Sequence, residues 1–559
     1  MFKKSALTLA VLFAATQMTA CSSSDENQAP TDIQLSHYSV EENAAGALIG
    51  TLSATDEDKD DTHTFSVSDE RFVVVNSELK LVDNAALNFE QEQTIELAVK
   101  VSDQDMAEFT KTLTIEVTDM LDTYNFGDSV SYSGQVARQL LILELTNYID
   151  KELEHDLGTE LMTRQQVLDK LMSFYKTDAD AYANDLSQRA FATSSLADAK
   201  QTSLSAISSS KKDLYGKIAG NDEKGQHKVW AEEFVAFGAK GAQSPDTLIQ
   251  HFFAKIADHA ELGFNGVERL DAFGDKITKV YLGEDGLDYK QLVQKVLLGA
   301  VNFSQGADDY LDDNTEGKGL LSDHTDFGDS KPYSVLEHQF DEGFGYFGAA
   351  RDYMEYSDDE IAGKDGREAF KGKHDTDGDG EIDLLSEFNF GHSVNAAKRD
   401  RGTANNTNPT DFTKDAMTAF IKGRELLRNT AGTDLDEAQM TELLGYRDTA
   451  LIAWEKAIAA TAVHYINDVN GDYGKFDTAD FSYADLAKHW SELKGFVISL
   501  QFNRHSPLLD ADHEKVNTLV GDAPELAADN FDAYMAKLVE ARDILAAAYE
   551  FDAENVDNW

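Results

Sequence analysis

The sequence predicts a multidomain protein in which an N-terminal all-β sandwich precedes a large all-α helical-bundle domain. Residues 30–118 contain short runs that alternate apolar and polar residues or are rich in β-branched residues, with turn residues between them. After residue 125, apolar residues recur at helical spacing over long stretches. Proline, which interrupts helices, occurs only 6 times in 559 residues.

The β region has the strand and turn spacing of a sandwich of two sheets. The clearest strand candidates are residues 33–36, 64–67, 79–82, 95–101 and 112–117. The pattern changes near residues 119–125, so we place the boundary of the β domain at residue 121 and assign residues 122–559 to the helical domain.

The helical domain shows both periodicity and an explicit helix start. The clearest helix candidates are residues 136–150, 164–175, 248–259, 416–427, 449–466 and 530–551. Ser334-Val-Leu-Glu337 has capping-box spacing, which predicts a helix that begins at Ser334 and runs toward Gly345 or Gly348.

The composition is strongly acidic. Lys and Arg total 49 against 102 Asp and Glu, so the formal net charge is −53. A surface of that charge repels nucleic-acid phosphates and attracts multivalent cations. The charge therefore argues against a nucleic-acid partner, although part of the acid excess is equally consistent with adaptation to a saline habitat.

Cys21 is the only cysteine, which excludes an intrachain disulfide and any zinc–thiolate or iron–sulfur site. It follows a basic start and the apolar run 6–15, and this pattern resembles a bacterial lipoprotein signal over residues 1–21. The resemblance implies that Cys21 is acylated, that residues 22–29 form a tether, and that the protein is lipid-anchored in the cell envelope. By resemblance to the sorting rule of such lipoproteins, Ser22 after the cysteine implies the outer membrane as the destination. The alternative is a plain signal peptide with an incidental cysteine.

The β region also resembles a bacterial cadherin-type repeat. The segments PTDIQLS, VEENAAG, IGTLSATDED, LNFE and VKVSD, which begin at residues 30, 40, 49, 87 and 99, occur in the order of that family. The resemblance implies a Greek-key β-sandwich over residues 30–121 with calcium at its ends. It places Glu42, Glu90 and Asp119 at one end and Asp56, Asp58 and Asp103 at the other.

Calcium takes six to eight oxygen ligands, which carboxylates from several loops supply together. The family's usual Asp-x-Asn-Asp-Asn linker is replaced here by Val117-Thr-Asp-Met-Leu-Asp122. The alternative is that these acids are only solvated loop ends.

A second calcium candidate is the EF-hand-like loop at residues 375–387 of the helical domain. Acids alternate along it, and Gly380 permits the sharp turn. Ser386 stands at the twelfth position, so either the loop bulges by one residue to use Glu387 or Asp383 closes the shell. The alternative is an acidic surface turn. The candidate ligands are Asp375, Asp377, Asp379, Glu381, Asp383 and Glu387. Asp468-Val-Asn-Gly-Asp472 is a weaker calcium candidate.

The helix that begins at Ser334 carries a third candidate set. Leu336, Phe340, Phe344 and Phe347 form its apolar stripe, while Glu337, His338, Asp341 and Glu342 are expected on the opposite face. His338 and Glu342 lie one turn apart, a chelating geometry for a divalent or ferric ion. The alternative is a solvated polar face with pairing inside the helix.

Residues 337–348 resemble an uncharacterised family of bacterial lipoproteins related to the imelysins, two-bundle helical proteins linked to iron uptake. The imelysin motif Gly-x-His-x-x-Glu is only partly kept, because Leu336 replaces the glycine and Asp341 the glutamate. His489-Trp-Ser-Glu492 looks like the last signature of the same family. The resemblance extends over residues 123–559 and implies that iron or another transition metal is handled.

The sequence thus predicts a non-enzymatic envelope lipoprotein that binds calcium and whose helical domain captures a metal such as iron. One alternative is a calcium-dependent adhesion protein that contacts another envelope or surface protein through the β domain, with a scaffold helical domain. Another is a metal-dependent peptidase, which is disfavoured because the sequence contains no His-Glu-x-x-His.

Overall fold

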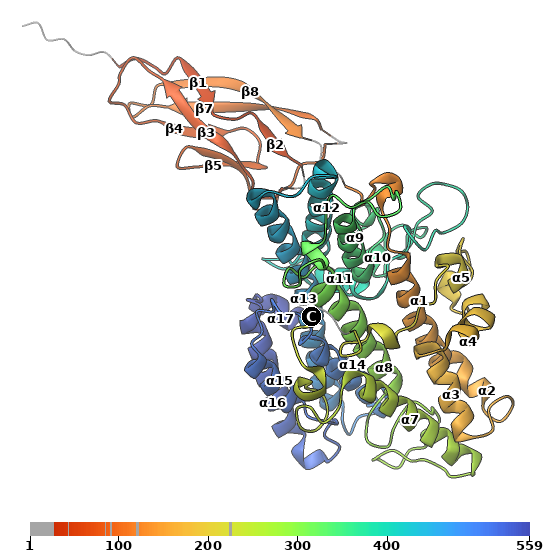
Figure 1. The fold of residues 1–559 in the computed structure, drawn as a ribbon. Coiled ribbons are helices and arrows are strands. Elements are labelled where there is room, and N and C mark those ends of the chain that lie inside the picture. The colour runs from red at the N-terminus through yellow and green to blue at the C-terminus, as the bar shows by residue number, and fades with distance from the viewer. Residues whose placement is uncertain (1–26, 43, 84, 90–91, 119–121, 223–225) are drawn as a thin grey trace, which may run out of the picture. The chain divides into compact units, whose positions relative to one another are not determined.

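The computed structural model describes residues 27–42, 44–83, 85–89, 92–118, 122–222 and 226–559. The chain divides into two compact units, Met1–Leu121 and Asp122–Trp559. The first is built from β-strands and the second mostly from helices (Figure 1). The fold class predicted from the sequence, a β domain followed by a large α domain, is confirmed.

The β unit consists of two four-stranded sheets among its described residues, with strand orders β1-β3-β6-β5 and β2-β8-β7-β4. The pairs β1–β3 and β7–β8 are antiparallel, whereas β2 runs parallel to β8. The strands are β1 Asp32–Leu35, β2 Ser39–Glu41, β3 Leu48–Thr55, β4 Thr64–Val67, β5 Phe72–Val75, β6 Glu78–Leu81, β7 Thr94–Ser102 and β8 Glu108–Thr118.

Alternation along the strands explains the core of this unit. In β7, Ile95, Leu97, Val99 and Val101 are buried, while the alternating residues Thr94 and Glu96 are exposed. These side chains join Leu79 of the other sheet in one cluster. Successive residues of a strand point to opposite faces, so one face of each sheet packs against the other sheet.

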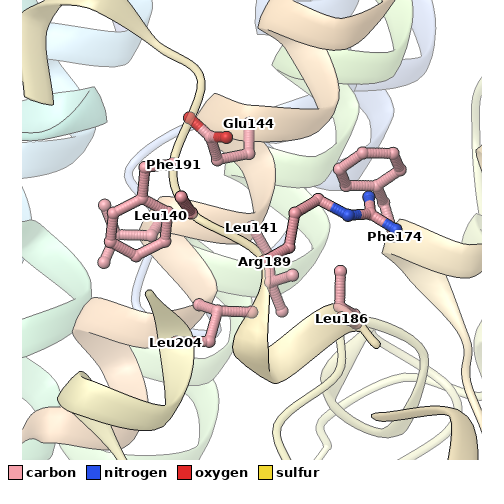
Figure 2. A pocket seen from close by; sticks show the side chains of 9 residues that line it. Leu140, Leu141, Glu144, Phe174, Leu186, Arg189, Phe191 and Leu204 are labelled. Carbon is pink, nitrogen blue, oxygen red and sulfur yellow. The ribbon is translucent and has the colours of Figure 1, made fainter. Parts of the chain in front are cut away.

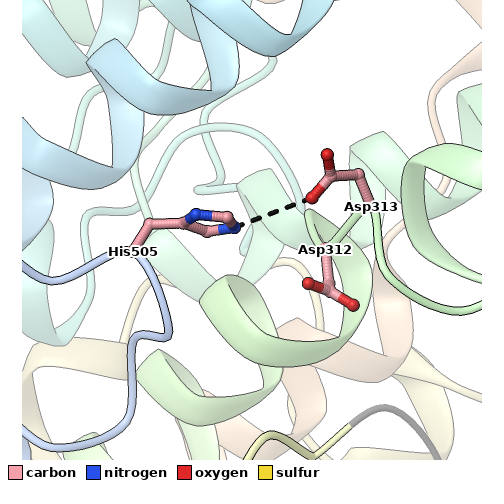
Figure 3. A group of neighbouring side chains, drawn as sticks. All are labelled: Asp312, Asp313 and His505. Carbon is pink, nitrogen blue, oxygen red and sulfur yellow. Dashed lines mark ion pairs between the residues drawn. The ribbon is translucent and has the colours of Figure 1, made fainter.

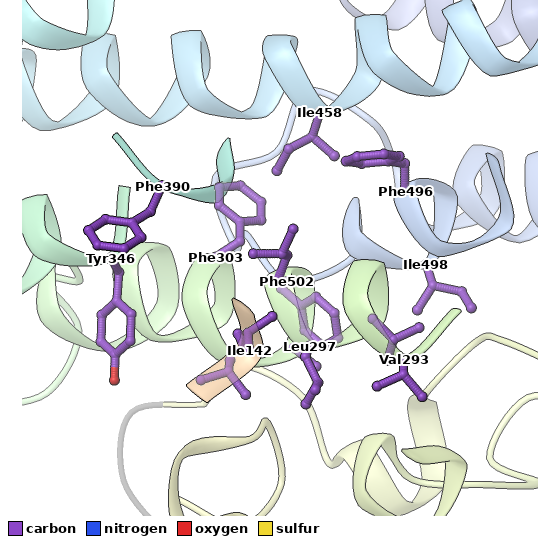
Figure 4. Close-up of a cluster of buried hydrophobic side chains, with 14 of the residues drawn as sticks. Ile142, Val293, Leu297, Phe303, Tyr346, Phe390, Ile458, Phe496, Ile498 and Phe502 are labelled. Carbon is purple, nitrogen blue, oxygen red and sulfur yellow. The ribbon is translucent and has the colours of Figure 1, made fainter. Parts of the chain in front are cut away.

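The helical unit has a continuous core. Buried side chains from Tyr124 to Trp559 belong to one cluster, part of which Figure 4 shows. The longest helix, α13, packs against α12 and α14. The helices are α1 Ser133–Asn147, α2 Leu153–Asp156, α3 Arg164–Tyr175, α4 Ala179–Asn184, α5 Leu204–Ile207, α6 Trp230–Glu233, α7 Pro245–Phe264, α8 Tyr289–Leu297, α9 Val335–Phe347, α10 Asp358–Ile361, α11 Gly391–Thr403, α12 Phe412–Thr430, α13 Glu437–Gly474, α14 Tyr483–Ser499, α15 Asp510–Val520, α16 Phe531–Ala548 and α17 Ala553–Asn558.

Helix α9 begins and ends where the sequence predicts. Ser334 accepts a hydrogen bond from the backbone N–H of Glu337, and the Glu337 side chain accepts one from Ser334 N–H, which completes the capping box. Gly348 ends the helix with a φ of 84°, a conformation that glycine adopts without steric cost.

The described helices include none that is both long and apolar enough to cross a lipid bilayer.

Candidate metal-binding sites

The loop at residues 375–387 folds around the carboxylate of Glu387. Glu387 is 4% exposed, and its two oxygens accept hydrogen bonds from the backbone N–H groups of Thr376 at 2.9 Å and Asp383 at 2.7 Å. Gly378 and Gly380 have φ values of 73° and 92°, which allow the chain to reverse sharply between them. The loop thus closes through Glu387, one residue after the usual position.

Three carboxylates of this loop converge. Asp375, Asp377 and Glu387 each place an oxygen within 4.8 Å of the other two. Asp375 Oδ2 accepts a hydrogen bond from Gly380 N–H at 2.9 Å, whereas Asp375 Oδ1 is buried and accepts none from the described part of the chain. A buried acceptor without a donor is costly, and a bound cation would satisfy it. The donor set is all oxygen, which suits calcium.

The other acids of the loop lie outside this group. Asp379 Oδ2 pairs with Lys200 Nζ at 2.6 Å, and this hydrogen bond lowers the pKa of Asp379. Asp383 Oδ1 accepts from Gln201 Nε2 at 2.8 Å, and Glu381 is exposed. Lys200 and Gln201 are distant from the loop in sequence, so no local pattern identified them as competitors for these carboxylates.

In the β unit, the loops that follow β3 and β7 bring a second group together. Asp56, Asp61 and Asp103 each place an oxygen within 4.8 Å of the others. Asp56 and Asp103 directly follow the ends of their strands, and Asp103 Oδ1 accepts from the N–H groups of Asp105 at 2.9 Å and Ala107 at 2.8 Å. Asp58, which the sequence placed in this set, instead accepts from Gln28 N–H at 2.7 Å and donates its own N–H to Asp56.

Asp61 was missed by the sequence analysis, although it lies in the acid-rich run between β3 and β4. Its Oδ1 accepts from Gln104 Nε2 at 2.7 Å, while its Oδ2 is buried and accepts no hydrogen bond from any described residue. Burial and the nearby carboxylates of Asp58 and Asp103 raise the pKa of Asp61. Asp61 therefore lies in a negative field that a cation would relieve.

The opposite end of the β unit is described only in part. Glu42 is fully buried, and its Oε2 accepts from Phe89 N–H at 2.7 Å. Its expected partners Glu90 and Asp119 lie outside the described residues, as does Cys21.

The structure does not bring the metal-ligand set predicted on α9 together. Asp341 is fully buried and accepts from Arg424 Nε at 2.8 Å, Tyr124 O–H at 2.8 Å and Ser131 N–H at 3.0 Å. Glu337 pairs with Arg424 Nη1 at 2.6 Å. The alternative interpretation, a solvated polar face, is also wrong for Glu337 and Asp341, because α12 packs against α9 and supplies a buried guanidinium.

The remaining pair on α9 lies apart from Arg424. His338 Nε2 is 3.9 Å from Glu342 Oε2, and Glu342 Oε1 accepts from Gln135 Nε2 at 2.8 Å. His338 Nδ1 is buried and forms no hydrogen bond with the described chain. The described groups of three or more potential metal ligands do not include His338, Asp341 and Glu342 as a set.

The two candidate ligands of the second imelysin-like signature also pair with different residues. His489 Nδ1 lies 2.7 Å from Asp472 Oδ2, whereas Glu492 pairs with Lys295 at 3.3 Å. The calcium candidate at residues 468–472 lies inside helix α13, so it forms no loop, and that prediction is wrong.

A third group, which sequence reasoning missed, consists of Asp312, Asp313 and His505 (Figure 3). His505 Nε2 is 3.7 Å from Asp313 Oδ1, and the two aspartates follow the π-helical segment Gly306–Tyr310. Arg504 lies 3.2 Å from Asp312, and Arg447 lies 3.2 Å from Asp313. Because two guanidinium groups already compensate both carboxylates, this group is a weaker cation candidate than the other two.

One small apolar cavity lies beside α1, between Leu140, Phe174 and Leu204 (Figure 2). Its volume is about 20 Å³, room for about one water molecule. Glu144 at its edge accepts from Ala192 N–H at 2.8 Å and Thr193 N–H at 3.0 Å, so this carboxylate is a loop anchor.

Comparison with known proteins adds one match. No curated protein matches the chain. Residues 123–362 match the model of a family described as a domain of unknown function (DUF4856), which spans the helical unit from its start through α9 and α10 and ends before the loop at 375–387.

Proposed function

We propose that this protein is a lipid-anchored, non-enzymatic protein of the cell envelope that binds calcium in both of its units. One observation carries the proposal. Each unit holds three converging carboxylates, and in each group one buried oxygen, Asp375 Oδ1 or Asp61 Oδ2, accepts no hydrogen bond from the described residues. Such oxygens are unfavourable in the protein alone and are the ligands that a hard cation requires.

Calcium fits these groups better than a transition metal does. Both groups offer only carboxylate oxygens, and calcium accepts irregular shells of six to eight oxygens from flexible loops. In the helical unit the ligands would be Asp375, Asp377 and Glu387. In the β unit they would be Asp56, Asp61 and Asp103.

The envelope location rests on the lipoprotein-like signal that ends at Cys21, with the outer membrane as the proposed destination. The cadherin-like motifs of residues 30–121 support an extracytoplasmic role, since extracellular calcium modules bind at roughly 0.1–1 mM. Calcium would then stiffen the β unit as a stalk.

Transition-metal handling by the helical unit is the second function that we propose, iron being the first choice. His338 Nδ1, buried and without a hydrogen bond, is the observation that favours it, with Glu342 as the nearest carboxylate on α9. The imelysin-like motifs agree with this function. Adhesion through the β unit is the competing interpretation.

Calorimetric titration of the full chain in detergent with calcium chloride, after chelator treatment, tests the main proposal. We expect Asp375→Asn and Asp61→Asn each to remove one class of sites, while Asp379→Asn, whose carboxylate pairs with Lys200, retains both. If all three variants bind calcium as the unaltered protein does, or if that protein binds none at ~10 mM calcium, the proposal fails.

Metal analysis of the same preparation separates the second function from adhesion. Stoichiometric iron, copper or zinc that is lost in His338→Ala supports capture, and absence of any transition metal favours adhesion. Chelator-sensitive cleavage of a casein-like substrate would instead indicate a peptidase.

A further inference from the structure

A cavity of about 250 Å³ in the helical unit is lined by no residue of the three candidate cation-binding groups described above. Its walls come from α1, the end of α8 with the residue that follows it, the start of α11 with the segment just before it, and Ser195 between α4 and α5. Six of its side chains are apolar: Ile142, Leu143, Leu298, Phe388, Phe390 and Val394. The others are mostly amides and lysines, and no carboxylate lines the cavity.

The two lysines of the cavity differ in their partners. Lys295 Nζ lies 3.3 Å from Glu492 Oε1 and donates to Gln294 Oε1 at 2.7 Å, so its charge is compensated. Lys398 forms no hydrogen bond or ion pair within the described chain. Burial, with repulsion from Lys295, lowers the pKa of Lys398 to about 8. The ammonium group of Lys398 is thus partly buried and forms no ion pair with a described residue, in a protein whose net charge is −53.

Asn389 provides an independent indication of a ligand. It is 4% exposed, and its Oδ1 accepts from Ala350 N–H at 2.7 Å, which fixes the orientation of the amide. The other end of this amide, Nδ2, is buried and donates to no described residue. A buried NH₂ group without an acceptor is unfavourable, and an oxygen atom in the cavity would satisfy it.

The N-terminus of helix α11 also makes the cavity favourable for an anion. Gly391, its first residue, lines the cavity, and no side chain caps the helix at Phe390. The N-terminus of this 13-residue helix carries partial positive charge. Ammonium, amide and helix N-terminus are all groups that recognise an anion, while the six apolar side chains suit a hydrocarbon portion.

We propose that this cavity binds a small organic monocarboxylate, with its carboxylate between Lys398 and Asn389 and its hydrocarbon chain against the apolar wall. One negative charge is expected because Lys295 already has Glu492 as its partner. This site is independent of calcium and of the proposed transition metal.

Titration of the full chain with sodium hexanoate, with hexanamide and with inorganic phosphate tests the proposal. We expect hexanoate to bind at least about tenfold more tightly than its uncharged amide. The Lys398→Met variant should lose about tenfold or more in hexanoate affinity, whereas Lys537→Met, at an exposed position on α16, should not change it.

A second variant separates loss of binding from loss of folding. Val394→Phe keeps Lys398 and Asn389 but occupies the cavity, so it should abolish hexanoate binding while calcium binding and the thermal midpoint stay near those of the unaltered protein. Equal binding of hexanoate and hexanamide, tighter binding of phosphate than of hexanoate, no binding of any probe, or unchanged hexanoate binding in Val394→Phe would each overturn the proposal.

Discussion

The guanidinium of Arg424 donates from Nε to Asp341 Oδ1 over 2.8 Å, and neither side chain has any solvent exposure. Burial raises the pKa of Asp341, and the adjacent Arg424 counteracts that rise. The same guanidinium binds Glu337 through Nη1, so it joins α12 to two successive turns of α9. This contact explains why the acids of α9 are structural rather than available to a metal ion.

Replacement of Arg424 by Met should destabilise the helical unit by about 3–5 kcal/mol, because Asp341 and Glu337 would remain buried without a counter-charge. Denaturant unfolding followed by circular dichroism measures the change. Arg401→Met is the matched control, since its pair with Asp359 is exposed and should contribute under about 1 kcal/mol. Equal losses in the two variants would refute a structural role for the buried contact.

Two helical glycines should respond to alanine with opposite signs. A Cβ at Gly423 would lie 2.5 Å from Cζ of Phe340, whereas a Cβ at the exposed Gly445 would meet no atom within 4 Å. Gly445→Ala should therefore stabilise the protein by about 0.5–1 kcal/mol through reduced backbone entropy. Gly423→Ala should destabilise it by about 1–3 kcal/mol through overpacking. Thermal unfolding of the two variants checks the signs, and stabilisation by both would contradict this account.

Stability should depend on pH through Glu455. This residue of α13 is fully buried, accepts hydrogen bonds from Asn503 and Tyr549, and has a pKa raised by burial to about 7. The pKa in the folded state exceeds the ordinary value of 4.5, so the contribution of Glu455 is complete below about pH 4.5 and is lost as pH rises through about 7.

In Glu455→Gln, whose side chain cannot titrate, the free energy of unfolding should fall less steeply as pH rises. The difference should reach up to about 1.4 kcal/mol for each unit by which the pKa of Glu455 in the folded state exceeds its ordinary value. Thermal midpoints between pH 5 and pH 8 provide the measurement. The raised pKa values of Asp358 and Asp400 remain in both proteins, so only the difference between the two profiles is informative. Parallel profiles would exclude Glu455 as a titrating group in this range.

Lys200 should oppose calcium binding at the loop. Its ammonium holds Asp379 at 2.6 Å and adds a positive charge beside the carboxylate group. In Lys200→Met, Asp379 is released and the local charge becomes more negative, so calcium affinity should rise several-fold, since ligand charge tunes such sites. Calorimetry with Lys537→Met as the control measures this change. A weaker calcium affinity in Lys200→Met would show that Lys200 instead orders the loop for binding.

By itself, the sequence determined the division into a β unit and a helical unit, because the alternation of β7 and the capping box of α9 are local signals. The local spacing of acids predicted Asp375, Asp377 and Glu387 as candidate ligands, whereas Asp56 and Asp103 were predicted from the resemblance to cadherin-type repeats.

Only the tertiary structure decided which acidic side chains are available to bind a cation. Arg424 reaches Asp341 across 83 positions and Lys200 reaches Asp379 across 179, and helical periodicity carries no information about such distant partners. The cavity beside Lys398 is likewise formed by segments that meet only in the folded chain. Burial makes each unpaired charge or amide costly, and only the three-dimensional packing shows which groups lack a partner.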